Sequence, residues 1–410
     1  MEPSALSARL ERLRQRYRDV AIFVFNSFLA LVLFNLALYG AFAAVDALSG
    51  PARLEGWMTG YVQKLGDTYR DLPESDVRQL VKETVSLNYA YEPFTQFRDR
   101  SQRGKFVNVD AHGFRHSISQ APWPPSPDSF NVFFFGGSTA FGWGLPDGST
   151  IPSWFQKLAP QAGGRPIAVY NFARMAYFST QERILFEQLL LSGHKPDAAI
   201  FVDGLNDLHW REGKPLYDGR FSTVLEGRPT WSPDWPMLRL ARVLRKHLPQ
   251  ARAASNDHKG GTPQSFQAAL DRYVSNKKLI ESASAASGVA PIFVWQPVPS
   301  YKHDGRRYYE RFHDSVPWRL WSLDAYGPVY EQVEDLAGAG QLGGNFLFCG
   351  SVTQGLDEVL YIDLVHYHPR LSQMVAECIV SQIRERSLLP LTAAATADAR
   401  TAQASRRRTP

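Results

Sequence analysis

The sequence predicts an α/β domain built on a parallel sheet and anchored to a membrane by one N-terminal helix. The first observation is an uncharged, mostly apolar run over residues 20–45. The second is the order of segments from residue 131 onward, where short apolar runs alternate with longer stretches of helical periodicity. Such alternation is typical of parallel strands that helices cover on both faces. The third is the composition, since 44% apolar and 21% charged residues over 410 residues describe a globular chain with a large core.

The formal net charge of +5 lies at the two ends of the chain. Residues 1–19 hold five arginines and three acidic residues, and residues 391–410 hold four arginines and one aspartate, so the body between them is neutral. A neutral body lacks the basic face with which proteins bind nucleic acid. Two cysteines are also too few for a disulfide framework or a multi-cysteine zinc module.

The apolar run at 20–45 is long enough to cross a hydrocarbon core of about 30 Å as a helix. The arginines before it place the N-terminus in the cytoplasm. We therefore expect a single-pass protein of the inner membrane, with a periplasmic or extracytoplasmic domain. A cleaved signal peptide is the alternative, because Ala-Phe-Ala at 41–43 fits a cleavage site, but the run exceeds the usual apolar core of such peptides. Asn26 and Asn35 either bind a partner helix or are simply tolerated.

The chain is expected to have five parts. These are a cytoplasmic N-terminus (1–19), the transmembrane helix (20–45), a membrane-proximal segment (46–128), a globular domain (129–390) and a disordered tail without large apolar residues (391–410). The membrane-proximal segment has a helical pattern broken near Pro73, then a stretch rich in prolines and aromatic residues that we expect to pack on the main domain.

Strands and helices of the globular domain follow from its periodicity. The apolar runs expected to be strands lie at 132–135, 167–170, 198–202, 291–295 and 346–348, and the expected helices at 181–191, 265–286, 320–336 and from Pro369 onward. Two insertions, at 208–262 and 298–345, carry five of the ten tryptophans. Those rings either form local cores for the insertions or stack on sugar rings or acyl chains.

Three short motifs carry candidate chemistry. The first strand runs into Gly136-Gly137-Ser138-Thr139, which presents a serine hydroxyl at the carboxyl edge of the sheet. The third strand ends in Asp203-Gly204-Leu205-Asn206-Asp207, where the Asn206 amide could donate to an oxyanion. Asp363-Leu364-Val365-His366 precedes the last helix, with a carboxylate spaced to hold one nitrogen of the imidazole. Each motif alone is equally readable as a turn or a chance pairing.

A metal site at His366 and His368 is a weaker interpretation of the last motif. Its spacing offers no third ligand, and nothing else in the chain implies a metal or an organic cofactor.

In this order, the motifs resemble the SGNH (GDSL-like) hydrolases, of a membrane-anchored bacterial type, over about residues 131–386. Gly137 stands where the GDSL spelling has aspartate. Residues 171–177, Asn-Phe-Ala-Arg-Met-Ala-Tyr, match the second block of the family, with Ala173 and Ala176 in place of both glycines. The resemblance implies a flavodoxin-like three-layer α/β/α sandwich with a five-stranded parallel sheet.

The resemblance also implies the site roles. Ser138 is the nucleophile, His366 its base and Asp363 the group that orients His366. The oxyanion is held by the N–H groups of Ser138 and Ala176 and by the amide of Asn206. An alanine at 176 keeps its N–H but is strained if the family's glycine has a positive φ.

Three functions follow for this family type. The first is a serine esterase that removes acyl groups, in particular acetyl, from an envelope or extracellular glycan or from a small ester. The second transfers the acyl group to a sugar hydroxyl with the same triad. The third is a catalytically inactive envelope-assembly or glycan-binding module. The oligomeric state is left open.

The two cysteines offer a further alternative. Outside the cytoplasm Cys349 and Cys378 could form a disulfide. Cys378 could equally be a small buried apolar residue on the last helix.

Overall fold

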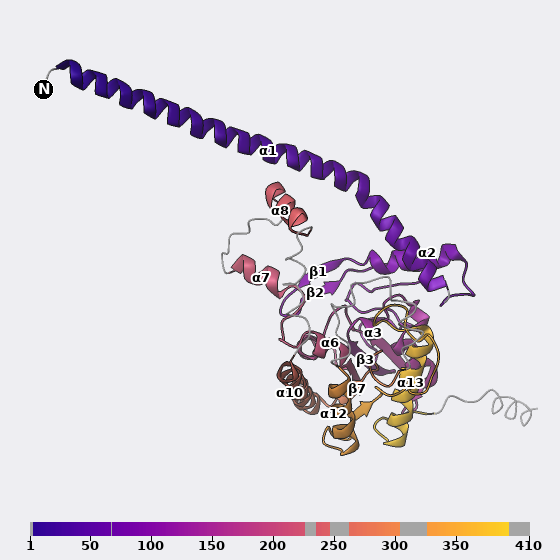
Figure 1. Ribbon diagram of the computed structural model, residues 1–410. Coiled ribbons are helices and arrows are strands. Elements are labelled where there is room, and N and C mark those ends of the chain that lie inside the picture. Colours follow the sequence, from indigo (N-terminus) through magenta and orange to yellow (C-terminus); the bar gives the residue numbers. More distant parts are fainter. Residues whose placement is uncertain (1–2, 67, 226–234, 247–261, 304–325, 393–410) are drawn as a thin grey trace, which may run out of the picture. The chain divides into compact units, whose positions relative to one another are not determined.

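The computed structural model describes residues 3–66, 68–225, 235–246, 262–303 and 326–392 (Figure 1). Most of the predicted tail, the centres of both insertions and the tryptophans at 231, 318 and 321 lie outside these residues. The chain forms two compact units: 1–57 with 219–257, and 58–218 with 258–410.

The first unit is built on α1 (Pro3–Gly66), which also extends into the second unit. Its stretch Arg9–Ala47 contains an 18-residue window with a mean hydropathy of 2.3, apolar enough to cross a membrane. Asn35 donates from its side-chain nitrogen to the carbonyl of Leu31 one turn earlier, at 2.9 Å, within its own helix. The insertion after the third strand adds α7 (Asp218–Leu225) and α8 (Pro236–Lys246). Arg239 of α8 forms a two-pronged ion pair with Asp46, both distances 2.7 Å.

The second unit holds a six-stranded sheet in the order β4-β5-β3-β6-β7-β8. The strands are β3 (Phe130–Gly136), β4 (Gln161–Ala162), β5 (Arg165–Asn171), β6 (Ala198–Asp203), β7 (Ala290–Trp295) and β8 (Phe346–Phe348). The five predicted strands are present and parallel. The predicted total of five is wrong by one, because Gly163 and Gly164, both at positive φ, let the chain fold back so that β4 pairs antiparallel with β5.

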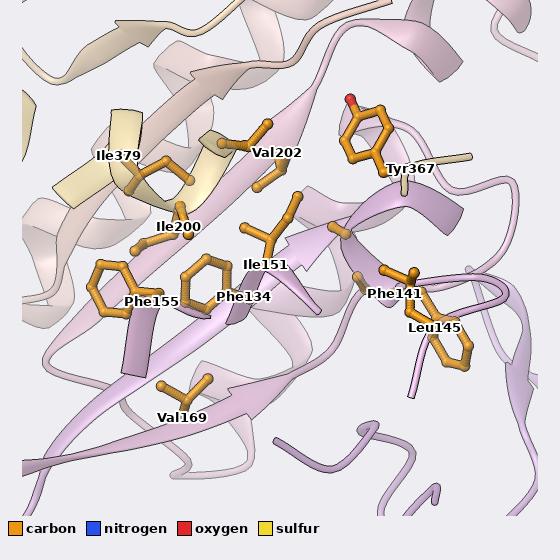
Figure 2. Packing of buried hydrophobic residues seen from close by; sticks show 14 of the residues in the cluster. Phe134, Phe141, Leu145, Ile151, Phe155, Val169, Ile200, Val202, Tyr367 and Ile379 are labelled. Carbon is orange, nitrogen blue, oxygen red and sulfur yellow. The ribbon is translucent and has the colours of Figure 1, made fainter. Parts of the chain in front are cut away.

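Helices cover both faces of the sheet, as the predicted three-layer sandwich requires. Alternate residues of the strands point to opposite faces. Phe134, Ile200 and Val202 face one layer, where Figure 2 shows them against Ile151, Phe155 and Ile379. This layer contains α4 (Ile151–Leu158) and α13 (Pro369–Glu385). The opposite layer contains α5 (Ser179–Leu191), α10 (Pro263–Ser287) and α12 (Gly327–Gly338).

An aromatic row marks the centre of the second layer. The rings of Phe135 and Phe201 stack at 4.8 Å, and those of Phe201 and Phe293 at 5.4 Å. The three residues sit side by side on adjacent strands β3, β6 and β7. Their stacking holds the strands whose carboxyl ends carry the predicted motifs.

The membrane-proximal residues from 58 onward pack into the same unit as the sheet. The helical pattern is broken at Pro73, as predicted, and resumes in α2 (Glu74–Val85). A hairpin follows that the sequence did not predict, β1 (Tyr89–Glu92) and β2 (Gln96–Asp99). Leu65 and Leu80 are fully buried in the core cluster that contains the strand residues. The short helices α3 (Ser138–Phe141), η1 (Asp147–Ser149) and α6 (Leu205–His209) complete the unit.

Cys349 and Cys378 form a disulfide that joins the end of β8 to α13. Of the two alternatives left open by the sequence, the structure has the bonded one.

Candidate active site

Ser138 stands at the carboxyl edge of the sheet, where β3 passes into α3. β3 ends at Gly136, whose φ of +152° lies in a region that residues with a Cβ rarely adopt. Gly137 then lies against the side-chain amide of Asn206, which a Cβ at position 137 would overlap. A larger residue at this place, where the GDSL spelling has aspartate, would require the Asn206 side chain to move.

The three residues predicted as a triad are joined by hydrogen bonds. His366 Nε2 lies 2.9 Å from Ser138 Oγ, and His366 Nδ1 lies 2.7 Å from Asp363 Oδ2. The Asp363 carboxylate only accepts, so the ring proton is assigned to Nδ1 and Nε2 is left to accept from the serine hydroxyl. The fold thus brings together a serine and a histidine that are 228 residues apart in the chain.

Asp363 is held by several donors at once. Its Oδ1 accepts from the backbone N–H groups of Val365 and His366, at 3.0 and 2.9 Å. Burial alone would raise the pKa of Asp363, but the charge and hydrogen bond of His366 and the two backbone donors outweigh it and lower the pKa to about 2. Asp363 is therefore ionised at neutral pH and can orient His366.

Gln296 links the serine side of the site to the histidine side. It follows β7 directly, and its Oε1 accepts from the hydroxyl of Thr139, the neighbour of Ser138. The same oxygen lies 3.0 Å from the hydroxyl of Tyr367, the neighbour of His366. The sequence reasoning missed Gln296, although its place at the carboxyl end of a predicted strand was a usable signal.

The three predicted oxyanion donors lie around this turn. Neither the N–H of Ser138, at the start of α3, nor that of Ala176 donates to another group among the residues that the structure describes. Asn206 Nδ2 donates one proton to the carbonyl of Tyr177, at 2.7 Å, and keeps its second proton. Ala176 has φ +57°, so it sits in the left-handed region that the family's glycine would favour.

Solved structures similar to this chain include GDSL-type and acyl-cleaving proteins. A GDSL-like lipase from Bacteroides thetaiotaomicron is 14% identical, with 64% of this chain and 91% of that chain covered and a TM-score of 0.35. A lipase/acylhydrolase from Enterococcus faecalis is 14% identical, with 64% and 99% covered and a TM-score of 0.33. An acetyl xylan esterase is 12% identical, with 62% and 99% covered and a TM-score of 0.33. No protein-family model matches the sequence, and no curated protein matches it.

The chain's own geometry decides the type of fold. Parallel strands in the order β5-β3-β6-β7-β8 place the serine turn, the Asn206 block and the Asp363–His366 segment in one site. The parallel α/β fold expected from the motifs is confirmed.

Ala176 occupies the second replaced glycine of the SGNH pattern, and its strain can be measured. We expect Ala176→Gly to raise the free energy of unfolding by about 0.5 to 1 kcal/mol, because glycine has no Cβ penalty at positive φ. Ala173→Gly is the matched control: Ala173 is buried and is not among the residues at positive φ, so glycine there should lower stability. Thermal unfolding of both variants checks this. Equal losses in both would show that Ala176 is not strained.

Arg115 supports the Ser138 turn from the membrane-proximal segment. Its guanidinium, 1% exposed, donates to the carbonyls of Phe141, Gly142 and Leu145 and pairs with Asp147 at 3.1 Å. These carbonyls lie at the end of α3 and just after it, and they have no partners within that helix. The sequence predicted no role for Arg115, because its partners lie in a different part of the chain.

Three carboxyl groups lie buried beside the Asn206 block. Burial raises the pKa of Glu182, Asp203 and Asp207, and repulsion between Asp207 and the other two raises the pKa of Glu182 and Asp203 further. Ser179 donates to Asp207 at 2.5 Å and so fixes the residue next to Asn206.

The raised pKa of Glu182 predicts a stability that depends on pH. The folded state holds a proton that the unfolded chain releases above about pH 4.3, so stability falls as the pH rises from there toward the folded pKa. The Glu182→Gln variant lacks this loss. We expect its stability relative to the parent to improve between pH 5 and pH 8, by up to about 1.4 kcal/mol per pH unit.

Unfolding of the detergent-solubilised chain at several pH values measures the effect. Glu187→Gln is the control, since Glu187 lies on the same helix, is 36% exposed and pairs with Arg183. A pH-independent difference for Glu182→Gln, or the same trend in both variants, would contradict the prediction.

His368 has a structural role. Its Nδ1 accepts from the backbone N–H of Arg370, at 3.1 Å, and so caps the start of α13. Over the described parts of the chain, no group of three or more His, Cys, Asp or Glu side chains is arranged to hold a metal ion.

Proposed function

We propose that this chain is a membrane-anchored serine esterase that removes acyl groups, principally acetyl, from an envelope or extracellular glycan. The observation that carries the proposal is the hydrogen-bonded series Ser138–His366–Asp363, with distances of 2.9 and 2.7 Å. A serine hydroxyl with a base and an oriented carboxylate is the arrangement needed for nucleophilic attack on an ester.

The acylation step uses each of these groups once. Ser138 Oγ attacks the ester carbonyl carbon while its proton moves to His366 Nε2. The negative charge that develops on the carbonyl oxygen is stabilised by the N–H groups of Ser138 and Ala176 and the Asn206 amide. As the tetrahedral species collapses, the bond to the leaving oxygen breaks, and His366 returns the proton to it. Asp363 stabilises the imidazolium between the two proton transfers.

Deacylation repeats the chemistry with an acceptor hydroxyl. His366 takes a proton from water, and the resulting attack releases the carboxylic acid and restores Ser138. If a sugar hydroxyl takes the place of water, the same steps produce an acylated sugar. Esterase and acyltransferase activity therefore share one site and differ in which acceptor reaches it.

Two features support a location outside the cytoplasm. The helical stretch Arg9–Ala47 contains an apolar run that can cross a membrane once, and the arginines before residue 20 favour a cytoplasmic N-terminus. The Cys349–Cys378 disulfide fits an oxidising compartment. A single-pass inner-membrane protein with a periplasmic or other extracytoplasmic domain accounts for both.

Aromatic side chains near the triad support a glycan as the substrate. The ring of Trp143, partly exposed, lies 5.8 Å from the ring of His366. Trp210 follows at the end of α6, the helix that carries Asn206. Indole faces pack well against the apolar faces of sugar rings.

An acceptor-resolved assay tests the proposal. The full chain in detergent is given an activated acetyl ester with and without an oligosaccharide, and both free acetate and acetylated sugar are measured. Acetate as the main product in both reactions supports the esterase, and acetylated sugar identifies the transferase. An inactive chain that also fails to react with a fluorophosphonate probe at Ser138 would refute both and favour the assembly module.

A further inference from the structure

The end of the membrane helix reaches the catalytic triad. Tyr61 lies near the C-terminal end of α1, in the part of that helix that belongs to the same compact unit as the sheet. Its hydroxyl donates to Asp363 Oδ2 at 3.2 Å, although the two residues are 302 positions apart in the chain. This is the oxygen that also accepts from His366 Nδ1, at 2.7 Å.

The carboxylate fixes the direction of that hydrogen bond. An ionised carboxylate only accepts, so the single proton of the Tyr61 hydroxyl is directed to Asp363 Oδ2. Burial and the charge of Asp363 also raise the pKa of Tyr61 well above its usual value, so the hydroxyl keeps that proton.

Tyr61 extends the hydrogen-bonded series of the triad by one residue. The series runs from Tyr61 to Asp363, then to His366 and Ser138. Trp143 lies on the serine side: its backbone N–H donates to the carbonyl of Ser138 at 3.0 Å, and its ring lies beside that of His366.

The two carboxylate oxygens of Asp363 have different hydrogen-bond donors. Oδ1 accepts the two backbone N–H groups of its own turn, which hold the carboxylate to its own segment. Oδ2, the oxygen that faces His366, has Tyr61 as its donor from outside that segment. A carboxylate with both oxygens satisfied has little freedom to rotate away from the imidazole.

We propose that Tyr61 is a positioning residue of the triad, which holds Asp363 Oδ2 against His366 and moderates its charge, and that the juxtamembrane end of α1 is thereby part of the active site. The proposal rests on the proposed function, since it assigns a role within that triad. It gives the anchor helix a second task, because the same helix that contains the apolar stretch supplies a side chain to the catalytic centre.

Tyr61→Phe in the full chain in detergent tests this role, because it removes one hydroxyl and keeps the ring. Without that donor Asp363 holds the imidazolium more strongly, so the acidic limb of the kcat/KM profile should move to higher pH by about 0.5 to 1 unit. A less constrained carboxylate should lower kcat about 3- to 10-fold. KM for p-nitrophenyl acetate should stay within about twofold, because Tyr61 does not contact the substrate.

Tyr69→Phe is the matched control. Tyr69 is also buried, and its hydroxyl donates to the Gly144 carbonyl at 2.7 Å, with no hydrogen bond to a triad residue. The charge and hydrogen bond of His366 lower the pKa of Asp363, and the nearby Tyr69 hydroxyl raises the pKa of Tyr61. A purely structural role for Tyr61 predicts that both variants lose thermal stability and leave the pH limb in place, and that outcome overturns the proposal.

The rate of reaction with a fluorophosphonate probe separates this proposal from the proposed function. If the parent reacts at Ser138 and Tyr61→Phe reacts at the same rate over the whole pH range, the positioning role fails while the serine hydrolase stands. If the parent itself does not react and Ser138→Ala does not change turnover, the proposed function fails. Slower reaction of Tyr61→Phe with a displaced pH limb, and an unchanged limb in Tyr69→Phe, supports the proposal.

Discussion

Replacing Ser138 with alanine is expected to lower turnover of p-nitrophenyl acetate by about 10⁴-fold or more. The reason is that in the proposed mechanism Ser138 supplies the only atom that forms a covalent bond with the acyl group, and His366 Nε2, 2.9 Å away, takes the proton of that atom. The side chain is small and 6% exposed, so its loss should leave the fold intact. Initial rates of the full chain in detergent, corrected for uncatalysed hydrolysis, provide the measurement.

Three further variants make the Ser138 result specific. His366→Ala should be about as inactive as Ser138→Ala, and the double variant no worse than either, because residues that act as a unit are not additive. Ser192→Ala is the control, since Ser192 is an exposed serine whose hydroxyl only donates to the Gln188 carbonyl. Turnover by purified Ser138→Ala equal to that of the parent would refute the nucleophile assignment.

The second large effect is expected at Asn206. Asn206→Ala should lower kcat by about 100- to 1000-fold, with a much smaller change in KM, because an oxyanion donor acts mainly in the transition state. The structure supports this role, since the amide lies against Gly137, next to the nucleophile, and one of its protons is not used by the Tyr177 carbonyl.

The effect of Asn206 on stability must be kept apart from its effect on catalysis. Loss of the bond to Tyr177 will lower the unfolding temperature somewhat, so unfolding is measured alongside kcat. Asn88→Ala is a suitable control, because Asn88 is an exposed asparagine whose side chain donates to the Ser86 carbonyl at 3.0 Å. A kcat for Asn206→Ala within about threefold of the parent, with a lower unfolding temperature, would assign Asn206 a structural role only.

Much of the fold could be predicted because its signals are local. The five parallel strands appear as apolar runs, and the last helix appears as Leu371, Val375 and Ile379 at helical spacing, all of them buried. β4 was missed because two residues are too short for a periodic pattern. The β1–β2 hairpin was missed because its stretch is short and mixed, and its support is a contact with Arg174 rather than a pattern of its own.

The site divides in the same way. Ser138, Asp363 and His366 could be named because their residue types and chain order match one chemistry. The roles of Gln296, Arg115 and Tyr61 could not be predicted. Each of these residues contacts a partner far away in the chain, and no local sequence pattern indicates that the two meet.

The sequence by itself therefore determined the five parallel strands, the apolar helix and the candidate triad residues, since these depend on residue type, spacing and order. Only the tertiary structure decided that Tyr61 meets Asp363, that Ala176 adopts a positive φ, and that Cys349 and Cys378 are bonded. The physical reason is that each of these depends on where distant backbone segments are brought by packing of the whole core. The net charge of +5 and the number of cysteines do not indicate which residues meet in the folded chain.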